Sequence, residues 1–135
     1  MKKIFLPFLL LGLFAMTSCG DDLGDAAVLA DVIVGTWKTD AVADLDAGTV
    51  TFNADGTGSA SDNSAMTIEV SDGTTDEVLT DFTWEYIEAD NMLELSYESA
   101  TTSTGGGVNW EVGDVFENQI NLSIPAFGLN VELNK

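Results

Sequence analysis

Apolar side chains recur at every second position along most of the chain, and this spacing constrains the fold more than any other feature. The clearest run is DFTWEYI, residues 81–87, in which three aromatic residues alternate with polar ones. Successive side chains of a β-strand point to opposite faces, so a period of two predicts strands with one apolar face. Comparable runs are found at residues 33–38, 49–53, 66–70, 93–97, 108–112, 120–124 and 129–133.

Short segments rich in Gly, Asn, Asp and Pro separate these runs, at residues 53–56, 71–73, 88–91, 104–107 and 125–128. Such residues favour tight turns, so consecutive strands are predicted to be antiparallel. With GTGSASD, residues 56–62, as a further short strand, nine runs are candidates for about eight strands. A sheet with one apolar face must bury that face and protect its edges, which a closed barrel or a sandwich achieves. The predicted fold is all-β: an antiparallel, up-and-down, eight-stranded β-barrel over residues 33–135, with a β-sandwich as the alternative.

A short helix is predicted just before the barrel. Residues 21–33 favour one or two helical turns, with Asp25 as the N-cap. Residues 19–32 are therefore assigned to an acidic tether and this helix.

The amino end has the anatomy of a signal peptide. Lys2 and Lys3 precede an apolar run, residues 4–14, that is too short to span a bilayer stably. Residues 16–19, MTSC, place the chain's only cysteine directly after small residues, and this resembles the lipobox of bacterial lipoproteins. The resemblance implies cleavage after residue 18 and acylation of the Cys19 thiol with chains such as palmitate. A thiolate is nucleophilic enough for that reaction, and several acyl chains hold a protein on a membrane durably.

Gly20, Asp21 and Asp22 follow the cysteine and resemble the surface-export signal of lipoproteins in the phylum Bacteroidota. This resemblance implies a location on the cell outer membrane, at the cell surface. Acidic residues also make an ordinary solvated tether, so the periplasmic face stays open as the alternative.

The charge of the chain is strongly negative. The sequence has 23 acidic residues against four Lys and Arg, a formal charge of −19, which becomes −21 when Lys2 and Lys3 are removed with residues 1–18. Nucleic-acid binding needs positive charge to displace counterions from phosphates, so no nucleic-acid partner is expected. Three Trp, two Tyr and many branched apolar residues nevertheless predict a folded domain.

The composition lacks most of the side chains that enzymes use for catalysis. The chain contains no histidine and no arginine, and its only cysteine, Cys19, is assigned to the anchor. Glu85 and Glu94 are a conceivable acid–base pair, but both fall on the polar parity of their strands, which favours a solvated face. The segment NADG, residues 53–56, superficially resembles a calcium loop and is typical of a hairpin turn. We expect no catalytic residue, no metal site, no cofactor and no enzymatic activity.

Several short motifs resemble one family. VGTWK, residues 34–38, has the Gly-x-Trp pattern of lipocalins in Gly35 and Trp37. The segments TFNADGTGSAS, FTWEY and LELSY, within residues 51–97, are similar to bacterial lipocalin-like lipoproteins of the Bacteroidota type. In lipocalins the Trp packs across the closed end of the barrel, below a ligand cavity, and an arginine packs over it. This chain lacks that arginine, and Lys38 is expected to point to the opposite face from Trp37.

The resemblance implies a binding function. The candidate ligand-binding residues are Trp37, Trp84, Tyr86 and Trp110; core packing is the alternative for all of them, and Trp110 is the one expected at an open mouth. The predicted function is a monomeric, lipid-anchored, lipocalin-like lipoprotein of the outer membrane that binds a small apolar ligand. The alternative is a structural or accessory surface lipoprotein with a protein or glycan partner and no small-molecule ligand.

Overall fold

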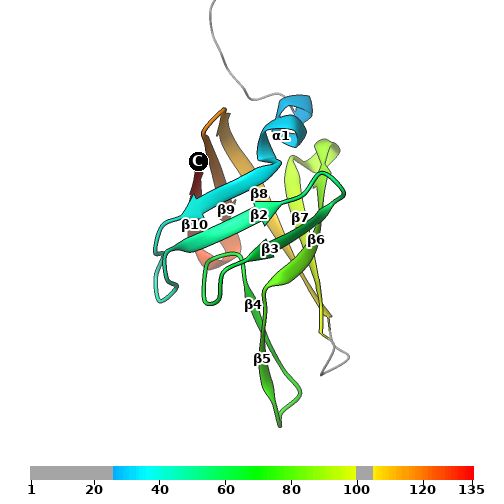
Figure 1. Cartoon of the computed structure of the whole chain (residues 1–135), viewed down its shortest axis with the longest axis vertical. Helices are drawn as coiled ribbons and strands as arrows, with labels where there is room; N and C mark the ends of the chain where they lie inside the picture. Colours follow the sequence, from blue (N-terminus) through cyan, green and yellow to red (C-terminus); the bar gives the residue numbers. More distant parts are fainter. Residues whose placement is uncertain (1–25, 100–104) are drawn as a thin grey trace, which may run out of the picture.

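Eight antiparallel strands close into a barrel, with one short helix at one end (Figure 1). The computed structural model describes residues 26–99 and 105–135, so residues 1–18, Cys19 and Asp25 lie outside the described residues. The helix α1 spans Ala26–Ile33. The barrel strands are β1 (Gly35–Thr39), β2 (Gly48–Phe52), β3 (Thr57–Ala60), β6 (Asp81–Ile87), β7 (Met92–Glu98), β8 (Gly105–Phe116), β9 (Gln119–Ile124) and β10 (Leu129–Asn134).

The order around the barrel is β1-β10-β9-β8-β7-β6-β3-β2, and every neighbouring pair is antiparallel. Consecutive barrel strands are therefore neighbours, and β10 returns to β1. Short 3-10 helices η1 (Glu88–Asp90) and η2 (Pro125–Phe127) form the connections β6–β7 and β9–β10. The predicted up-and-down, eight-stranded barrel with a short preceding helix is confirmed.

Apolar side chains from alternate positions fill the barrel interior. In β7, for example, Leu93, Leu95 and Tyr97 are buried, whereas the residues between them are more exposed. Removing apolar surface from water stabilises the fold by roughly 25 cal/mol per Å². The largest fully buried side chains are Trp37, Trp110, Tyr97, Phe52, Leu29, Ile33, Met66, Leu93, Leu95, Ile120, Leu122 and Leu133.

The helix end of the barrel, defined as the end covered by α1, is closed by contacts between the helix and the wall. Leu29 and Ile33 of α1 are buried. The indole Nε1 of Trp37 donates a hydrogen bond to the Ile33 carbonyl at 2.6 Å, and Lys135 Nζ donates to the Val32 carbonyl at 3.2 Å. Both carbonyls belong to the last turn of the helix, where backbone oxygens lack partners within the helix. Two side chains from the barrel therefore fix α1 to this end.

Lys135 also lies over the aromatic face of Trp37, with Nζ 4.5 Å from the ring centroid. A cation in this position is attracted by the negative face of the indole. Lys135 thus occupies the place over the tryptophan that the lipocalin resemblance gives to an arginine, whereas Lys38 is exposed.

The hairpin end, opposite α1, carries an extra two-stranded sheet that projects beyond the barrel (Figure 1). Its strands are β4 (Ile68–Ser71) and β5 (Asp76–Leu79), inserted between β3 and β6. The predicted strand at residues 66–70 thus belongs largely to this hairpin and not to the barrel.

The plug segment, defined as residues 64–68, leads into this hairpin and lies at the mouth of the barrel. Ser64, Ala65 and Met66 are buried, and the Tyr97 hydroxyl donates to the Met66 carbonyl at 2.5 Å. A Cβ atom on Gly106 would stand 2.7 Å from Ile68 Cδ1, so the glycine leaves the space that this side chain fills. The plug therefore packs against β7 and β8.

Three elements differ from the sequence predictions: the end of α1, the start of β8 and the extra strand β5. Ile33 ends α1 and does not begin a strand, because its buried side chain packs as part of the helix. Residues 105–107 belong to β8 and do not form a loop, since each pairs with a residue of β7. The strand β5 was not predicted, because DEVL contains only two apolar residues.

Among the residues that the structure describes, no helix has the length and apolar character needed to cross a membrane.

Candidate functional site

The four predicted ligand-binding aromatic residues lie on three different strands. Trp37 on β1 and Trp110 on β8 are 0% and 1% exposed, while Trp84 and Tyr86 on β6 are half-buried. Trp84 contacts Phe52, with ring centroids 5.8 Å apart, and Trp37 faces Lys135. The four residues therefore differ in strand and in burial.

Trp84 and Tyr86 make hydrogen bonds that hold the turns at the helix end. Trp84 Nε1 lies 3.1 Å from the carbonyl oxygens of both Asn53 and Thr57, across the β2–β3 turn. The Tyr86 hydroxyl donates to Asn91 Oδ1 at 2.6 Å, next to η1. The polar atoms of both side chains are thus engaged in the fold.

An aromatic cluster occupies the interior beside the plug segment. Phe82 lies 5.6 Å from Phe52 and 5.5 Å from Tyr97 between ring centroids, and Phe52 lies 5.8 Å from Trp84. Burial raises the pKa of the Tyr97 hydroxyl well above its usual range. The sequence pattern placed Tyr97 on an apolar face but gave no sign that its hydroxyl would bind the plug.

Trp110 differs from Trp37 in the hydrogen bonding of its indole N–H. Trp110 Nε1 is buried and has no hydrogen-bond partner among the described residues, and the same holds for the Ser64 hydroxyl. An unpaired buried donor costs roughly 1–3 kcal/mol, so native structures rarely leave one without a reason. Trp110 therefore offers a free donor within an apolar interior, and not at an open mouth.

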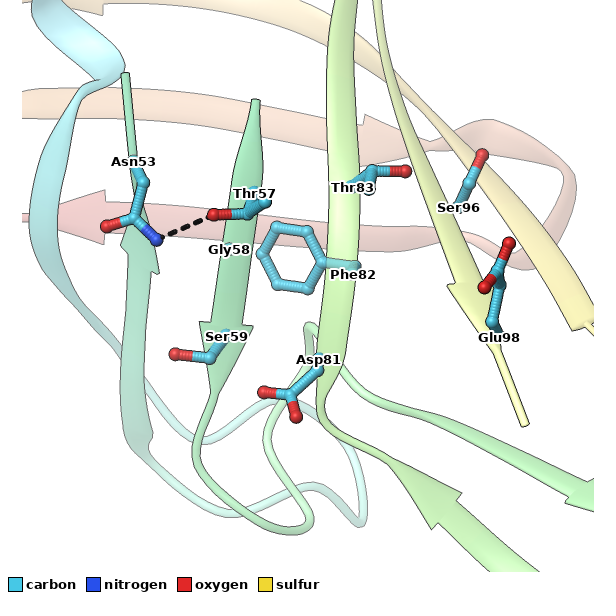
Figure 2. Close-up of a pocket in the computed structure, with 9 residues that line it drawn as sticks. All are labelled: Asn53, Thr57, Gly58, Ser59, Asp81, Phe82, Thr83, Ser96 and Glu98. Carbon is cyan, nitrogen blue, oxygen red and sulfur yellow. Dashed lines mark hydrogen bonds between the residues drawn. The ribbon is translucent and has the colours of Figure 1, made fainter. Parts of the chain in front are cut away.

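A groove lies on the outer face of β3, β6 and β7 (Figure 2). Its volume is about 430 Å³, within the roughly 300–1,000 Å³ typical of ligand sites. A second hollow of about 330 Å³ adjoins it and shares Thr83 and Ser96. The groove is lined by Asn53, Thr57, Gly58, Ser59, Asp81, Phe82, Thr83, Ser96 and Glu98.

The acidic residues singled out in the sequence lie on the outer face of the barrel or in a turn. Glu85 and Glu94 are register partners on the outer face of β6 and β7, where Glu85 is exposed. Asp55 lies in the β2–β3 turn, where hydrogen bonds from the hydroxyl and backbone N–H of Thr57 lower the pKa of its carboxyl. Within the described part of the chain, no three acidic, histidine or cysteine side chains are grouped so that they could hold a metal ion.

The fold thus defines the protein as a closed, antiparallel, eight-stranded barrel with a helix across one end. Comparison with protein-family models finds no match, and comparisons with curated proteins and with solved structures find none either.

Proposed function

We propose that this protein is a lipid-anchored, non-enzymatic binding module of the outer membrane, whose barrel takes a small apolar ligand with one hydrogen-bond acceptor. The anchor in this proposal is acylated Cys19. The observation that carries the ligand proposal is the unpaired N–H of Trp110 inside an apolar interior.

The chemistry of the ligand follows from the surroundings of that N–H. Trp110 pairs with Leu93 across β7 and β8, and the neighbouring inward positions are apolar. An indole N–H only donates, so its partner must be an acceptor such as a carbonyl or ether oxygen. An ester or ketone with a hydrocarbon body meets both requirements, because the oxygen pairs with the donor and the body contacts the apolar walls.

The hairpin end provides the route to the interior. The helix end is fixed by the Trp37 and Lys135 hydrogen bonds to α1. The plug segment and the hairpin are held by the Tyr97–Met66 hydrogen bond, the Ile68–Gly106 packing and a 2.5 Å hydrogen bond from Ser99 Oγ to Glu77 Oε2. They belong to an insertion between two barrel strands, so they can move while the barrel strands stay paired. The core is already filled by large side chains, so binding requires this plug to move outward.

Native mass spectrometry of the purified protein tests the proposal directly, since a bound lipid or pigment adds a discrete mass. A second test compares methyl palmitate, which has an acceptor, with hexadecane, which has none, by displacement of a fluorescent apolar dye. We expect the ester to bind more tightly, by about tenfold for a hydrogen bond of roughly 1.4 kcal/mol. Trp110→Phe should abolish that preference, whereas the control Trp84→Phe should keep it. Protein that is always recovered empty and binds neither compound would refute the proposal.

A further inference from the structure

We propose that the outer groove on β3, β6 and β7 is a second binding site, and that it takes a neutral saccharide chain. This site lies on the flank of the barrel, and its polar side chains point away from the interior, whereas Phe82 of its lining is a buried core residue. It is independent of a ligand inside the barrel.

One row of the groove consists of hydroxyl groups at matching register positions. Thr57 on β3 pairs with Thr83 on β6, and Thr83 pairs with Ser96 on β7, so the three side chains lie side by side across the sheet. Thr57 Oγ1 already accepts from Asn53 Nδ2 and donates to Asp55. Among the described residues, Thr83 and Ser96 have no side-chain hydrogen bond, so their hydroxyls are free to donate and accept.

A second row supplies acceptors. Ser59 on β3 pairs with Asp81 on β6, and Glu98 lies two residues beyond Ser96 on the same face of β7. Figure 2 shows Ser59 and Asp81 at one end of the groove and Glu98 beside Ser96 along β7. An ionised carboxylate only accepts hydrogen bonds, so this row suits a ligand with several hydroxyl donors.

The lining also excludes one class of saccharide. The lysines of the described residues, Lys38 and Lys135, do not line the groove, while Asp81 and Glu98 place two carboxylates within it. Like charges repel, so sugars with carboxylate, sulfate or phosphate groups are disfavoured. The groove therefore fits hydroxyl-rich, uncharged sugars and discriminates against acidic ones.

The length of the site favours a chain over a single sugar. The groove continues into the second hollow through the shared residues Thr83 and Ser96, and Glu85 and Glu94 extend the acceptor lining there. Strand side chains repeat at fixed spacing along a sheet, so successive sugar units meet similar hydroxyl and carboxylate groups.

A glycan array carrying neutral and acidic oligosaccharides tests this site. Full-length protein is applied in a detergent without a sugar headgroup, with a chelator present to exclude bridging by divalent cations. We expect binding to neutral glycans and none to acidic ones. Absence of any bound neutral glycan, or equal binding to acidic glycans, would overturn the proposal.

Matched variants then locate the site with the best neutral glycan. Thr83→Tyr fills the point where the two hollows meet, and we expect at least a tenfold loss of affinity. Lys38→Tyr places the same side chain on the exposed face of β1, outside both hollows, and should leave affinity unchanged. Glu98→Gln should weaken binding several-fold with little effect on folding, since Glu98 is exposed, whereas Glu111→Gln on β8 should not. Affinity unchanged in both Thr83→Tyr and Glu98→Gln would assign the glycan to another surface.

Discussion

The same substitution at two equally buried tryptophans should have very different costs, because only one indole N–H has a partner. Trp37 and Trp110 are 0% and 1% exposed, so Trp→Phe removes about the same apolar contact at either site. At Trp37 the change also removes the hydrogen bond to the Ile33 carbonyl, at a cost of roughly 1–3 kcal/mol. It further weakens the contact with the Lys135 cation, a contact worth roughly 0.5–1 kcal/mol near the surface.

At Trp110 the change removes a donor that is buried and unpaired in the protein without ligand. Relief of that desolvation cost, roughly 1–3 kcal/mol, offsets part of the lost packing. We therefore expect Trp37→Phe to destabilise the protein by about 3 kcal/mol more than Trp110→Phe, or about 12 °C in Tm at roughly 4 °C per kcal/mol.

Urea unfolding followed by the fluorescence of the remaining tryptophans measures this difference. The two variants should have the same m value, which would show that the comparison concerns stability alone. Equal destabilisation, or a greater cost at Trp110, would refute the account of the two N–H groups.

Four further outcomes are expected. Cys19→Ala should move the protein from the detergent phase to the aqueous phase in Triton X-114 partitioning; unchanged partitioning would contradict the proposed anchor. Burial raises the pKa of Tyr97, so the unfolded state loses this proton first, and the contribution of Tyr97 to stability should be constant below about pH 10 and fall above it by up to about 1.4 kcal/mol per pH unit. Tyr97→Phe should flatten this alkaline slope in urea titrations. Moderate salt should raise Tm, because it screens repulsion among the many carboxylates, and a Tm independent of salt would argue against such repulsion. Gly106→Val should displace Ile68 and speed hydrogen exchange in residues 66–79 without unfolding the barrel; unchanged exchange would show that this contact does not hold the hairpin.

Most of the barrel could be predicted because short stretches of sequence are enough to identify its strands and turns. A period of two assigns inward and outward positions within each strand, and turn residues fix the connections. The runs around Phe82, Leu93 and Leu122 lie in β6, β7 and β9, with boundaries within one or two residues of those predicted. Closure is the preferred prediction and not the only one, because a β-sandwich also buries one face and protects its edges.

The parts that could not be predicted depend on contacts between distant segments. Ile68 and Val70 alternate like barrel residues, and nothing local shows that β4 pairs with β5 outside the barrel. The position of Lys135 over Trp37 joins residues almost a hundred positions apart, and one lysine gives no sequence signal of such a contact. The missing partner of Trp110 is likewise a property of the folded interior.

The short seam between β1 and β10 sets how the molecule would respond to mechanical load. Only Lys38–Asn134 and Thr39–Leu133 pair there, whereas β1 and β2 pair over five positions. Tension applied through the amino end reaches α1 and β1 first, so the seam would rupture before the longer ladders and β1 would stay joined to β2. Such a rupture would open the wall along its length while the other strands remained paired, and the free edge of β10 would then be exposed to a neighbouring chain.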